Sequence, residues 1–412
     1  MKKVLAVMMS LLMVVALFAG CGNDGTPAAT PAPSSNDGTP AATPAGSENA
    51  DPSAAVAPIK IGMTGPLTGG AAIYGTAVEA GMKIAVEEIN AAAGENGLKI
   101  EFKSYDDEHN GEKAVNGYNS LKDWGMQFFA GTVTTGPALS VAPYAVQDNI
   151  FMLTPSASSV DVPEYGDNIF QMCFTDPNQG ASAAEVVYNY NPDAKIGIIY
   201  DSSDDYSIGL MYGFTDKADE LGLNIVTETS FSESTKADLS TQVGKCKSDG
   251  CDLVFMPFYY EQAAQILNYA NSIGYAPTFV GCDGMDGLLT LEGFNPAVAE
   301  GLILLTPFSA SNTDAATVDF VTKYKAMMNG TEPNQFAADG YDVIYAIYNA
   351  CVATGVNGDT SASDACDAVA AYFTSHTFDG LTGSDLIWSE EGTVTKNPEA
   401  VKIVNGRYVA MN

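Results

Sequence analysis

Residues 130–159 read AGTVTTGPALSVAPYAVQDNIFMLTPSASS, and the order of apolar and hydroxyl residues in this stretch decides the fold. The apolar run at residues 126–130 is typical of a strand and leads into Thr134-Thr135 and then a helical run. A second predicted strand, residues 150–153, leads into Thr154-Pro155-Ser156-Ala157-Ser158. Two neighbouring strands therefore end in small hydroxyl residues. Because open α/β sheets bind small ligands at this carboxyl edge, the stretch predicts one half of a solute pocket.

Strand-like and helix-like segments alternate along most of the chain. Strands are predicted at residues 59–65 and 99–105, with helices at 75–93 and 113–124. The alternation restarts after residue 174, with predicted helices at 178–190, 206–221, 239–247 and 260–273 and strands at 195–200, 224–231, 252–257, 277–281 and 302–306. Such repeats predict an α/β fold with doubly wound parallel sheets. The remaining stretch of about 350 residues is longer than a single hydrophobic core usually accommodates, which predicts two lobes.

The C-terminal part has a different pattern. Helices are predicted at residues 318–328, 337–354 and 364–375 with no strong strand between them, so we expect them to pack on the first lobe. Residues 401–404 and 407–410 flank Asn405-Gly406 and predict a hairpin.

The N-terminus predicts an exported protein. Lys2-Lys3 precedes an apolar run at residues 4–18, and Ala19-Gly20 stands directly before Cys21. This pattern indicates a signal peptide over residues 1–20. The small residues before the cysteine resemble a bacterial lipobox, although Phe18 stands where leucine is usual. The resemblance implies that Cys21 becomes the lipid-modified N-terminus.

Residues 21–57 are rich in Thr, Pro and Ala, and the sequence NDGTPAATPA occurs at residues 23–32 and again at 36–45. Such a composition buries too little apolar surface to offset its ordering entropy. We expect a disordered tether between the membrane and the folded domain.

The charge balance excludes several kinds of partner. The chain has 50 acidic and 18 basic residues; without residues 1–20, 16 basic residues remain and the net charge is −34. A field of this sign repels nucleic acid and anionic lipid. Arg407 is the only arginine, which argues against phosphate-binding arginine forks.

Six cysteines remain beside Cys21. Export permits disulfides, and Cys246–Cys251 and Cys351–Cys366 are candidate pairs because they are close in sequence. The other two are Cys173 and Cys282, and buried free thiols remain an equal alternative for all six.

The sequence gives little support for catalysis, a metal or a cofactor. The run Asp106-Asp107-Glu108-His109 has metal-binding residue types but is interpreted as an acidic turn after a strand. His109 and His376 are the only histidines, and there is no HExxH motif or phosphate-binding loop. We therefore expect a binding protein, not an enzyme.

From Ile59 to the end the sequence resembles the leucine/isoleucine/valine-binding family of type I periplasmic binding proteins, the extracellular receptors of ABC importers. The motifs that carry the resemblance are spread over the whole domain in order: IGMTGPLTGGAAIYG, YDDEHNGEKAV, FMLTPSAS, FQMCFTDPNQG, IYDSSDDYSIG, FMPFYYEQAAQIL, FVGCDG and AEGLILLTPF.

The resemblance implies two lobes joined by three crossover segments, near Thr175–Asn178, Thr306–Phe308 and Phe378–Gly380. The first lobe would comprise residues 58–176 and 306–379, and the second lobe 177–305, to which the C-terminal segment 380–412 would return.

The resemblance also implies which residues bind the ligand. Thr134 or Thr135 would meet the ligand carboxylate, with a one-residue ambiguity. Asp283 would accept the ligand ammonium, where the family often has Glu. The remaining expected pocket residues are Tyr74, Ser156, Ala157, Ser158, Tyr206 and Tyr259, with Tyr260 a competitor for the role of Tyr259.

The expected function is an extracytoplasmic, lipid-anchored receptor that is monomeric. It would close on a small amino acid, most readily a branched-chain or aliphatic one, and deliver it to an ABC permease. Two alternatives stay open: a sensory receptor of the same fold, or a transport receptor for a short amide, urea or aromatic acid.

Overall fold

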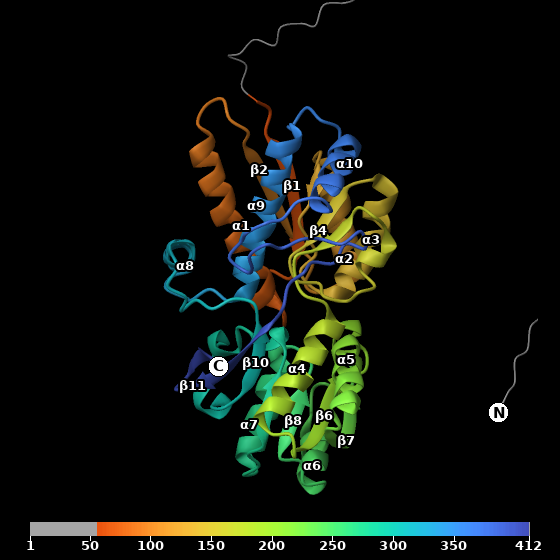
Figure 1. The fold of residues 1–412 in the computed structure, drawn as a ribbon, viewed down its shortest axis with the longest axis vertical. Coiled ribbons are helices and arrows are strands. Elements are labelled where there is room, and N and C mark those ends of the chain that lie inside the picture. Colours follow the sequence, from red (N-terminus) through yellow and green to blue (C-terminus); the bar gives the residue numbers. More distant parts are fainter. Residues whose placement is uncertain (1–55, 412) are drawn as a thin grey trace, which may run out of the picture. The chain divides into compact units, whose positions relative to one another are not determined.

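The computed structural model describes residues 56–411, and these form two lobes, each built on its own sheet (Figure 1). The predicted signal peptide, Cys21 and all of the predicted tether except its last two residues lie outside the described residues. No helix within residues 56–411 is long and apolar enough to cross a membrane.

The first lobe contains a parallel sheet in the order β2-β1-β3-β4-β5. Its first strand is apolar and buried along nearly its whole length, as expected for a strand covered on both faces. The strands and the helices between them are β1 (Ile59–Gly65), α1 (Ala72–Ala93), β2 (Ile100–Asp106), α2 (Gly111–Asp123), β3 (Phe128–Phe129), α3 (Thr135–Asp148), β4 (Phe151–Thr154) and β5 (Ile169–Gln171).

The second lobe contains a sheet in the order β12-β11-β10-β9-β8-β6-β7, in which β11 is antiparallel to both of its neighbours, β10 and β12, and all other pairs are parallel. Its elements are α4 (Asp176–Tyr190), β6 (Lys195–Asp201), α5 (Asp205–Leu221), β7 (Asn224–Phe231), α6 (Ser240–Ser248), β8 (Leu253–Met256), α7 (Tyr260–Ser272), β9 (Thr278–Gly281), β10 (Ile303–Thr306), β11 (Glu399–Val404) and β12 (Arg407–Ala410).

The predicted hairpin is confirmed. Asn405 and Gly406 join β11 to β12 with φ angles of 52° and 70°, the left-handed conformation that a two-residue hairpin turn requires.

Three late helices belong to the first lobe, as expected: α8 (Ala315–Met327), α9 (Gln335–Thr354) and α10 (Ala362–Phe373). In Figure 1, α9 runs alongside α1, and the two helices pack closely because Gly81 and Gly340 lie at their contact. A Cβ on Gly81 would stand 1.9 Å from the carbonyl oxygen of Ala337, which no side-chain shift can relieve.

We predict that Gly81→Ala destabilises the protein by about 1–3 kcal/mol, because α1 and α9 must separate to admit the methyl group. Gly244→Ala is the matched control, since Gly244 lies within α6 and its Cβ would meet no atom within 4 Å. That control should gain about 0.5–1 kcal/mol from helix propensity. Urea unfolding of both variants checks this; equal effects would contradict the packing argument.

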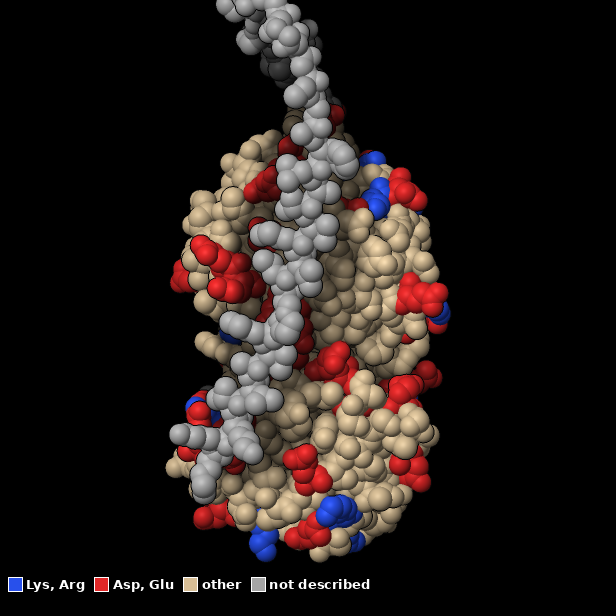
Figure 2. Space-filling model, turned by 90° about the vertical axis from the view of Figure 1, so that its right-hand side faces the viewer, with Lys and Arg blue, Asp and Glu red and all other residues tan. Residues whose placement is uncertain are grey.

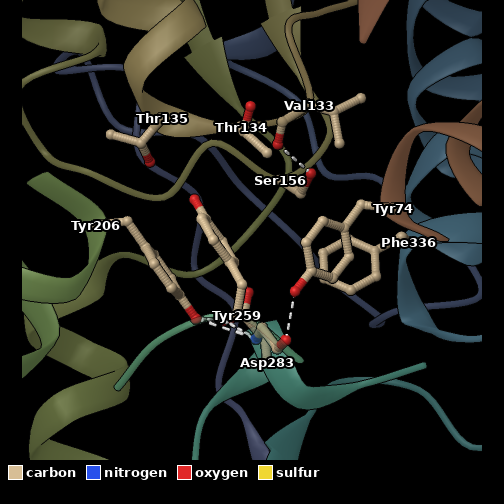
Figure 3. A pocket seen from close by; sticks show the side chains of 10 residues that line it. Tyr74, Val133, Thr134, Thr135, Ser156, Tyr206, Tyr259, Asp283 and Phe336 are labelled. Atoms are coloured by element: carbon tan, nitrogen blue, oxygen red, sulfur yellow. Dashed lines mark hydrogen bonds between the residues drawn. The ribbon is translucent and has the colours of Figure 1, made fainter. Parts of the chain in front are cut away.

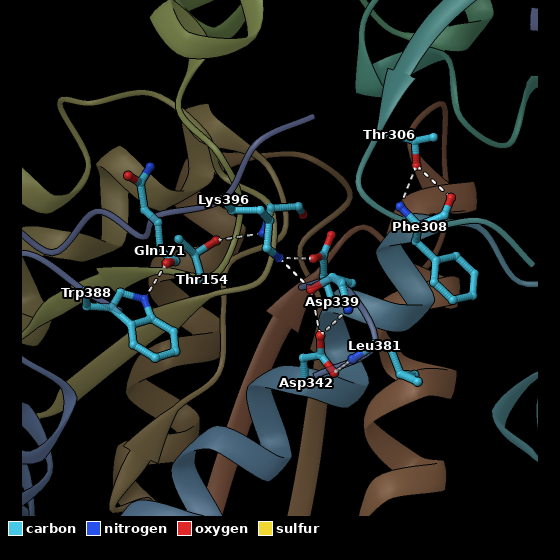
Figure 4. A network of polar contacts seen from close by, with 11 residues as sticks. Thr154, Gln171, Thr306, Phe308, Asp339, Asp342, Leu381, Trp388 and Lys396 are labelled. Atoms are coloured by element: carbon cyan, nitrogen blue, oxygen red, sulfur yellow. Dashed lines mark hydrogen bonds and ion pairs between the residues drawn. The ribbon is translucent and has the colours of Figure 1, made fainter. Parts of the chain in front are cut away.

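The chain crosses between lobes at residues 172–175 and 307–314, close to the first two predicted crossovers. The third crossing comes later than predicted. Residues 378–396 stay on the first lobe: the Trp388 indole N–H donates to the Gln171 carbonyl (2.7 Å), and the Lys396 ammonium donates to Asp339 (2.9 Å; Figure 4). The prediction near Phe378–Gly380 is corrected to the short link before β11, because these long-range contacts hold the segment back.

The six cysteines within the described residues are buried free thiols. The sulfurs of Cys246 and Cys251 both lie within 3.0 Å of the point where a Cβ on Gly197 would stand, so this candidate pair is adjacent without a bond. The Cys366 thiol of the second candidate pair instead donates to the Asn149 side chain at 3.5 Å.

Acidic side chains are spread over both lobes of the face in Figure 2, with few basic ones among them. This surface agrees with the acidic composition of the chain, and the described residues that are visible on this face form no basic patch for nucleic acid.

Candidate functional site

A pocket lies where the carboxyl ends of the first-lobe strands face the second lobe (Figure 3). Seven of the nine predicted ligand-binding residues line it. The space among its side chains is about 240 Å³ only when the part that is open to solvent is included. The lining residues are Tyr74, Val133, Thr134, Thr135, Ser156, Tyr206, Tyr259, Asp283, Gly284 and Phe336.

Hydroxyl groups build the first-lobe wall. The Thr154 hydroxyl donates to the Thr132 carbonyl (2.6 Å) and accepts the N–H of Ala157 (2.9 Å), while the Ser156 hydroxyl donates to the Val133 carbonyl (2.6 Å). These hydrogen bonds tie the ends of β3 and β4 together. The hydroxyls of Thr154 and Ser156 are therefore occupied by the loops themselves.

Thr134 and Thr135 differ in what their hydroxyls contact. The Thr134 hydroxyl lies 2.9 Å from Nδ1 of His109. The Thr135 hydroxyl is buried and has no partner within the described residues. No side chain caps α3, so the first N–H groups of this helix also remain available. A helix N-terminus with an unpartnered hydroxyl is suited to an anion, and of the two threonines only Thr135 has its hydroxyl unpartnered.

The second-lobe wall is aromatic and carries one carboxylate. The rings of Tyr206 and Tyr259 stack in parallel, 4.9 Å apart and inclined by 1°. The Tyr206 hydroxyl donates to Asp283 Oδ1 (2.6 Å), and the Gly284 N–H donates to the same oxygen (2.8 Å). Burial raises the pKa of Asp283, and these two donors together with Gln179 oppose the rise. A cation entering the pocket would stabilise the ionised form.

Tyr74 connects the two lobes. Its hydroxyl donates to the Gly284 carbonyl and accepts the N–H of Tyr260 at 3.2 Å. Its ring packs against Phe336 of α9, with centroids 4.6 Å apart. Tyr260 therefore contributes to the contact between the lobes, while Tyr259 lines the pocket, which separates the two competing tyrosines.

Two predicted residues lie behind the pocket wall. Ala157 and Ser158 are completely buried and do not line the space. Three residues that line the pocket were missed by the sequence analysis: Val133, Gly284 and Phe336. Val133 and Gly284 stand next to predicted residues, whereas nothing in the sequence placed the start of α9, and with it Phe336, beside Tyr74.

The acidic turn after β2 has a structural role. Asp106 accepts the N–H of Leu67 (2.8 Å) and the hydroxyl of Thr68 (2.5 Å), and Asp107 accepts the N–H of His109 (2.9 Å). No cluster of three metal-binding side chains occurs within residues 56–411. The turn therefore shapes the loop that brings His109 to Thr134.

The two lobes, the parallel sheets and the pocket between them define a two-lobed solute-binding protein. The sequence profile described as "Periplasmic binding protein" matches residues 58–407, and the chain belongs to this family. A similar curated protein is "Leu/Ile/Val-binding protein homolog 3" of Brucella melitensis, 29% identical over 313 residues, which cover 75% of this chain and 83% of the relative.

Solved structures agree in fold. The leucine binding protein LivK of Thermotoga maritima is 25% identical with a TM-score of 0.76, covering 86% of this chain and 98% of its own. The branched-chain amino acid transporter substrate binding protein LivJ of Streptococcus pneumoniae, solved with isoleucine, is 26% identical with a TM-score of 0.75, covering 85% and 98%. The predicted fold class and family are thus confirmed.

Proposed function

We propose that the protein is an extracytoplasmic receptor that closes on an α-amino acid, a branched-chain or other small aliphatic one, and delivers it to an ABC importer. One observation carries the proposal. The uncapped N-terminus of α3 with the Thr135 hydroxyl stands on one wall of the pocket, and the Asp283 carboxylate stands on the other.

This arrangement matches a zwitterion. A carboxylate entering the closed pocket loses its hydration and needs N–H and O–H donors, which α3 and Thr135 supply without a cation. An ammonium needs acceptors, and Asp283 supplies a carboxylate for it. The two opposite charges of an amino acid would each find a partner, so neither is left unpaired in the closed form.

Apolar area is available for the side chain. Val133, Tyr74 and Phe336 line the same pocket, and aromatic rings add flat apolar surface at low conformational cost. The similar proteins described as binding leucine, isoleucine and valine support an aliphatic side chain here. The export signal supports membrane anchoring through Cys21 and action outside the cytoplasm. We further propose that the receptor acts as a monomer.

A thermal-shift screen against the twenty amino acids, followed by titration calorimetry, tests the proposal. A ligand present at 100 times its Kd should stabilise the closed form by about 2.7 kcal/mol, and this should raise the melting temperature. We expect leucine, isoleucine or valine among the stabilising ligands. Stabilisation by benzoates, urea or amides with none by amino acids would overturn it.

The position of His109 predicts that binding weakens at low pH. His109 packs edge-on against Tyr259 (5.5 Å), across the cleft from its own lobe. Burial lowers the pKa of His109 below its ordinary 6.5; Lys236 acts in the same direction, and Glu233 and Asp201 oppose it. Because a lowered pKa disfavours the protonated base, closure loses stability as pH falls below 6.5.

We expect an affinity loss of up to about tenfold at one pH unit below 6.5, because each unit of pKa shift corresponds to a factor of ten. His109→Gln should flatten that part of the pH profile. Calorimetric titrations of both proteins between pH 5.5 and 7.5 check this, and parallel profiles would exclude His109 as the group responsible.

A further inference from the structure

Two buried cysteines meet at the C-terminal end of α6 in the second lobe. Cys246 lies in the last turn of this helix, and Cys251 stands two residues before β8. Their exposed fractions are 0% and 3%. Their sulfurs lie 2.9 Å and 3.0 Å from the point where a Cβ on Gly197 of β6 would stand. The two thiols are therefore directed at the same spot on the neighbouring strand.

The way that α6 ends brings the two side chains together. The N–H of Cys251 donates to the carbonyl of Cys246 (3.0 Å), and the N–H of Gly250 donates to the carbonyl of Lys247 (3.2 Å). Gly250 has a φ of 76°, in the left-handed region. These features define a Schellman motif, which commonly places the side chain of its last residue against that of its first. The contact between Cys246 and Cys251 is thus a consequence of the helix end.

This geometry suits a covalent bond between the sulfurs. A disulfide requires neighbouring backbones and side chains that face each other. The backbone hydrogen bond between Cys246 and Cys251 and their shared direction toward Gly197 provide both. The thiol of Cys366, in contrast, is directed at the side chain of Asn149 at 3.5 Å.

The end of α6 has few buried contacts of its own. The helix has nine residues, of which Val243 and Cys246 are buried. A helix of this length is marginal by itself. Residues 247–250, which join the two cysteines, are all exposed. Local opening of this turn would bring both thiols to the solvent, and a bond between them would oppose that opening.

We propose that Cys246 and Cys251 are a modification site, at which a small disulfide such as glutathione disulfide converts the two thiols into an intramolecular disulfide that fixes the end of α6 to the start of β8. The inference is independent of amino-acid binding, since neither cysteine lines the pocket. The export signal supports contact with an oxidising environment, where disulfides form and persist.

The reaction is a pair of thiol–disulfide exchanges. Burial raises the pKa of Cys246 to about 12, and the neighbouring Cys251 adds to the rise, so the first attack falls to Cys251 at the edge of the exposed turn. The Cys251 thiolate attacks one sulfur of glutathione disulfide and releases one glutathione. After local opening, the Cys246 thiolate attacks the Cys251 sulfur and releases the second. The protein loses two protons and two electrons, which the two glutathione thiols carry away.

Mass spectrometry of the unaltered protein after incubation with glutathione disulfide tests the proposal. The intact mass should fall by about 2 Da, and the number of free thiols should fall by two. Trypsin cleaves after Lys247, between the two cysteines, so the two resulting peptides should stay joined until a reductant is added. The melting temperature should rise by about 3 °C, as for a short closed loop in a chain of this size. Hydrogen exchange over residues 240–252 should become slower.

Two variants make the test specific. Cys251→Ala should abolish both the mass loss and the rise in melting temperature. Cys351→Ala, which removes a fully buried thiol from α9, is the matched control and should preserve both. Oxidation should leave leucine affinity within about threefold, because the bond forms outside the pocket.

Other results would overturn the proposal. Glutathione adducts without the mass loss, unchanged thiols in the folded protein, or a disulfide that joins other cysteines would each show that Cys246 and Cys251 only pack together. A bond that forms without slowing hydrogen exchange in α6 would exclude its effect on that helix. None of these outcomes affects the amino-acid receptor, which fails only if the unaltered protein binds no amino acid in the screen.

Discussion

Asp283→Ala is expected to lower amino-acid affinity by roughly 2–5 kcal/mol, which is the range measured when one partner of a buried charge pair is truncated. In the closed pocket the ligand ammonium would lose its strongest acceptor, and water cannot replace it because the lobes are in contact through Tyr74. Titration calorimetry with L-leucine measures the loss.

The same substitution should not weaken the ligand-free protein. Burial raises the pKa of Asp283, so ionising this carboxyl is less favourable in the folded than in the unfolded protein. The carboxylate therefore destabilises the folded protein as the pH rises above the ordinary carboxyl range. Removing the carboxylate should leave the melting temperature at pH 7 equal or higher. Binding sites commonly reduce the stability of the ligand-free protein in this way. Loss of affinity together with an unfolded variant would not count as support.

Two further variants make the Asp283 experiment specific. Tyr206→Phe removes only the hydroxyl that donates to Asp283 and should lower amino-acid affinity by about 1.5–3 kcal/mol, as for the loss of a hydrogen bond to a charged group. Asp205→Ala removes the exposed carboxylate of the residue directly before Tyr206 and should leave the affinity unchanged. If leucine titrates Asp283→Ala with the heats of the unaltered protein, Asp283 does not bind the ammonium.

The second large effect concerns stability. Lys396→Met should destabilise the protein by about 3–5 kcal/mol at pH 8, because it leaves the Asp339 carboxylate buried without its partner. The side chains of Lys396 and Asp339 (Figure 4) are only 1% and 3% exposed. The ammonium also donates to the Thr382 hydroxyl at 2.6 Å. Urea unfolding measures the change.

The loss of unfolding free energy in Lys396→Met should become smaller as the pH falls. Burial already raises the pKa of Asp339 to about 7 while Lys396 opposes the rise, so without the lysine the carboxyl stays protonated at higher pH. Protonation removes the unpaired charge, and the variant should recover stability below pH 7.

Surface and double substitutions provide the controls for Lys396. Lys323→Met breaks two ion pairs, with Glu88 and Asp319, but the Lys323 side chain is 42% exposed. This substitution should therefore lower the free energy of unfolding by no more than about 1 kcal/mol. Combining Lys396→Met with Asp339→Asn should restore part of the loss, since no charge is then left buried. Equal effects of Lys396→Met and Lys323→Met would contradict the buried-pair argument.

Much of the fold followed from local signals. The helical spacing of apolar residues, the apolar strands and the Asn405-Gly406 turn each depend on neighbours a few residues away, and the helices and strands formed close to the expected positions. The prediction of the third crossover failed because the position of this segment depends on distant residues. Residues 378–396 show no strong hydrophobic periodicity, and the ion pair between Lys396 and Asp339, 57 residues earlier, holds them on the first lobe.

The candidate site divides in the same way. Thr134, Thr135 and Ser156 could be located because they follow strands whose carboxyl ends must meet at one sheet edge. Phe336 reaches the pocket only because α9 packs on α1 through two glycines, a contact between helices far apart in the sequence.

The sequence by itself determined the α/β class, the family and most of the residues around the pocket, since periodicity and motif order are properties of neighbouring residues. Only the tertiary structure decided which threonine has its hydroxyl available, which tyrosine lines the pocket and where the chain last crosses between lobes. Those outcomes depend on contacts between segments far apart in the chain, and on which buried polar group is left without a partner once the lobes have packed.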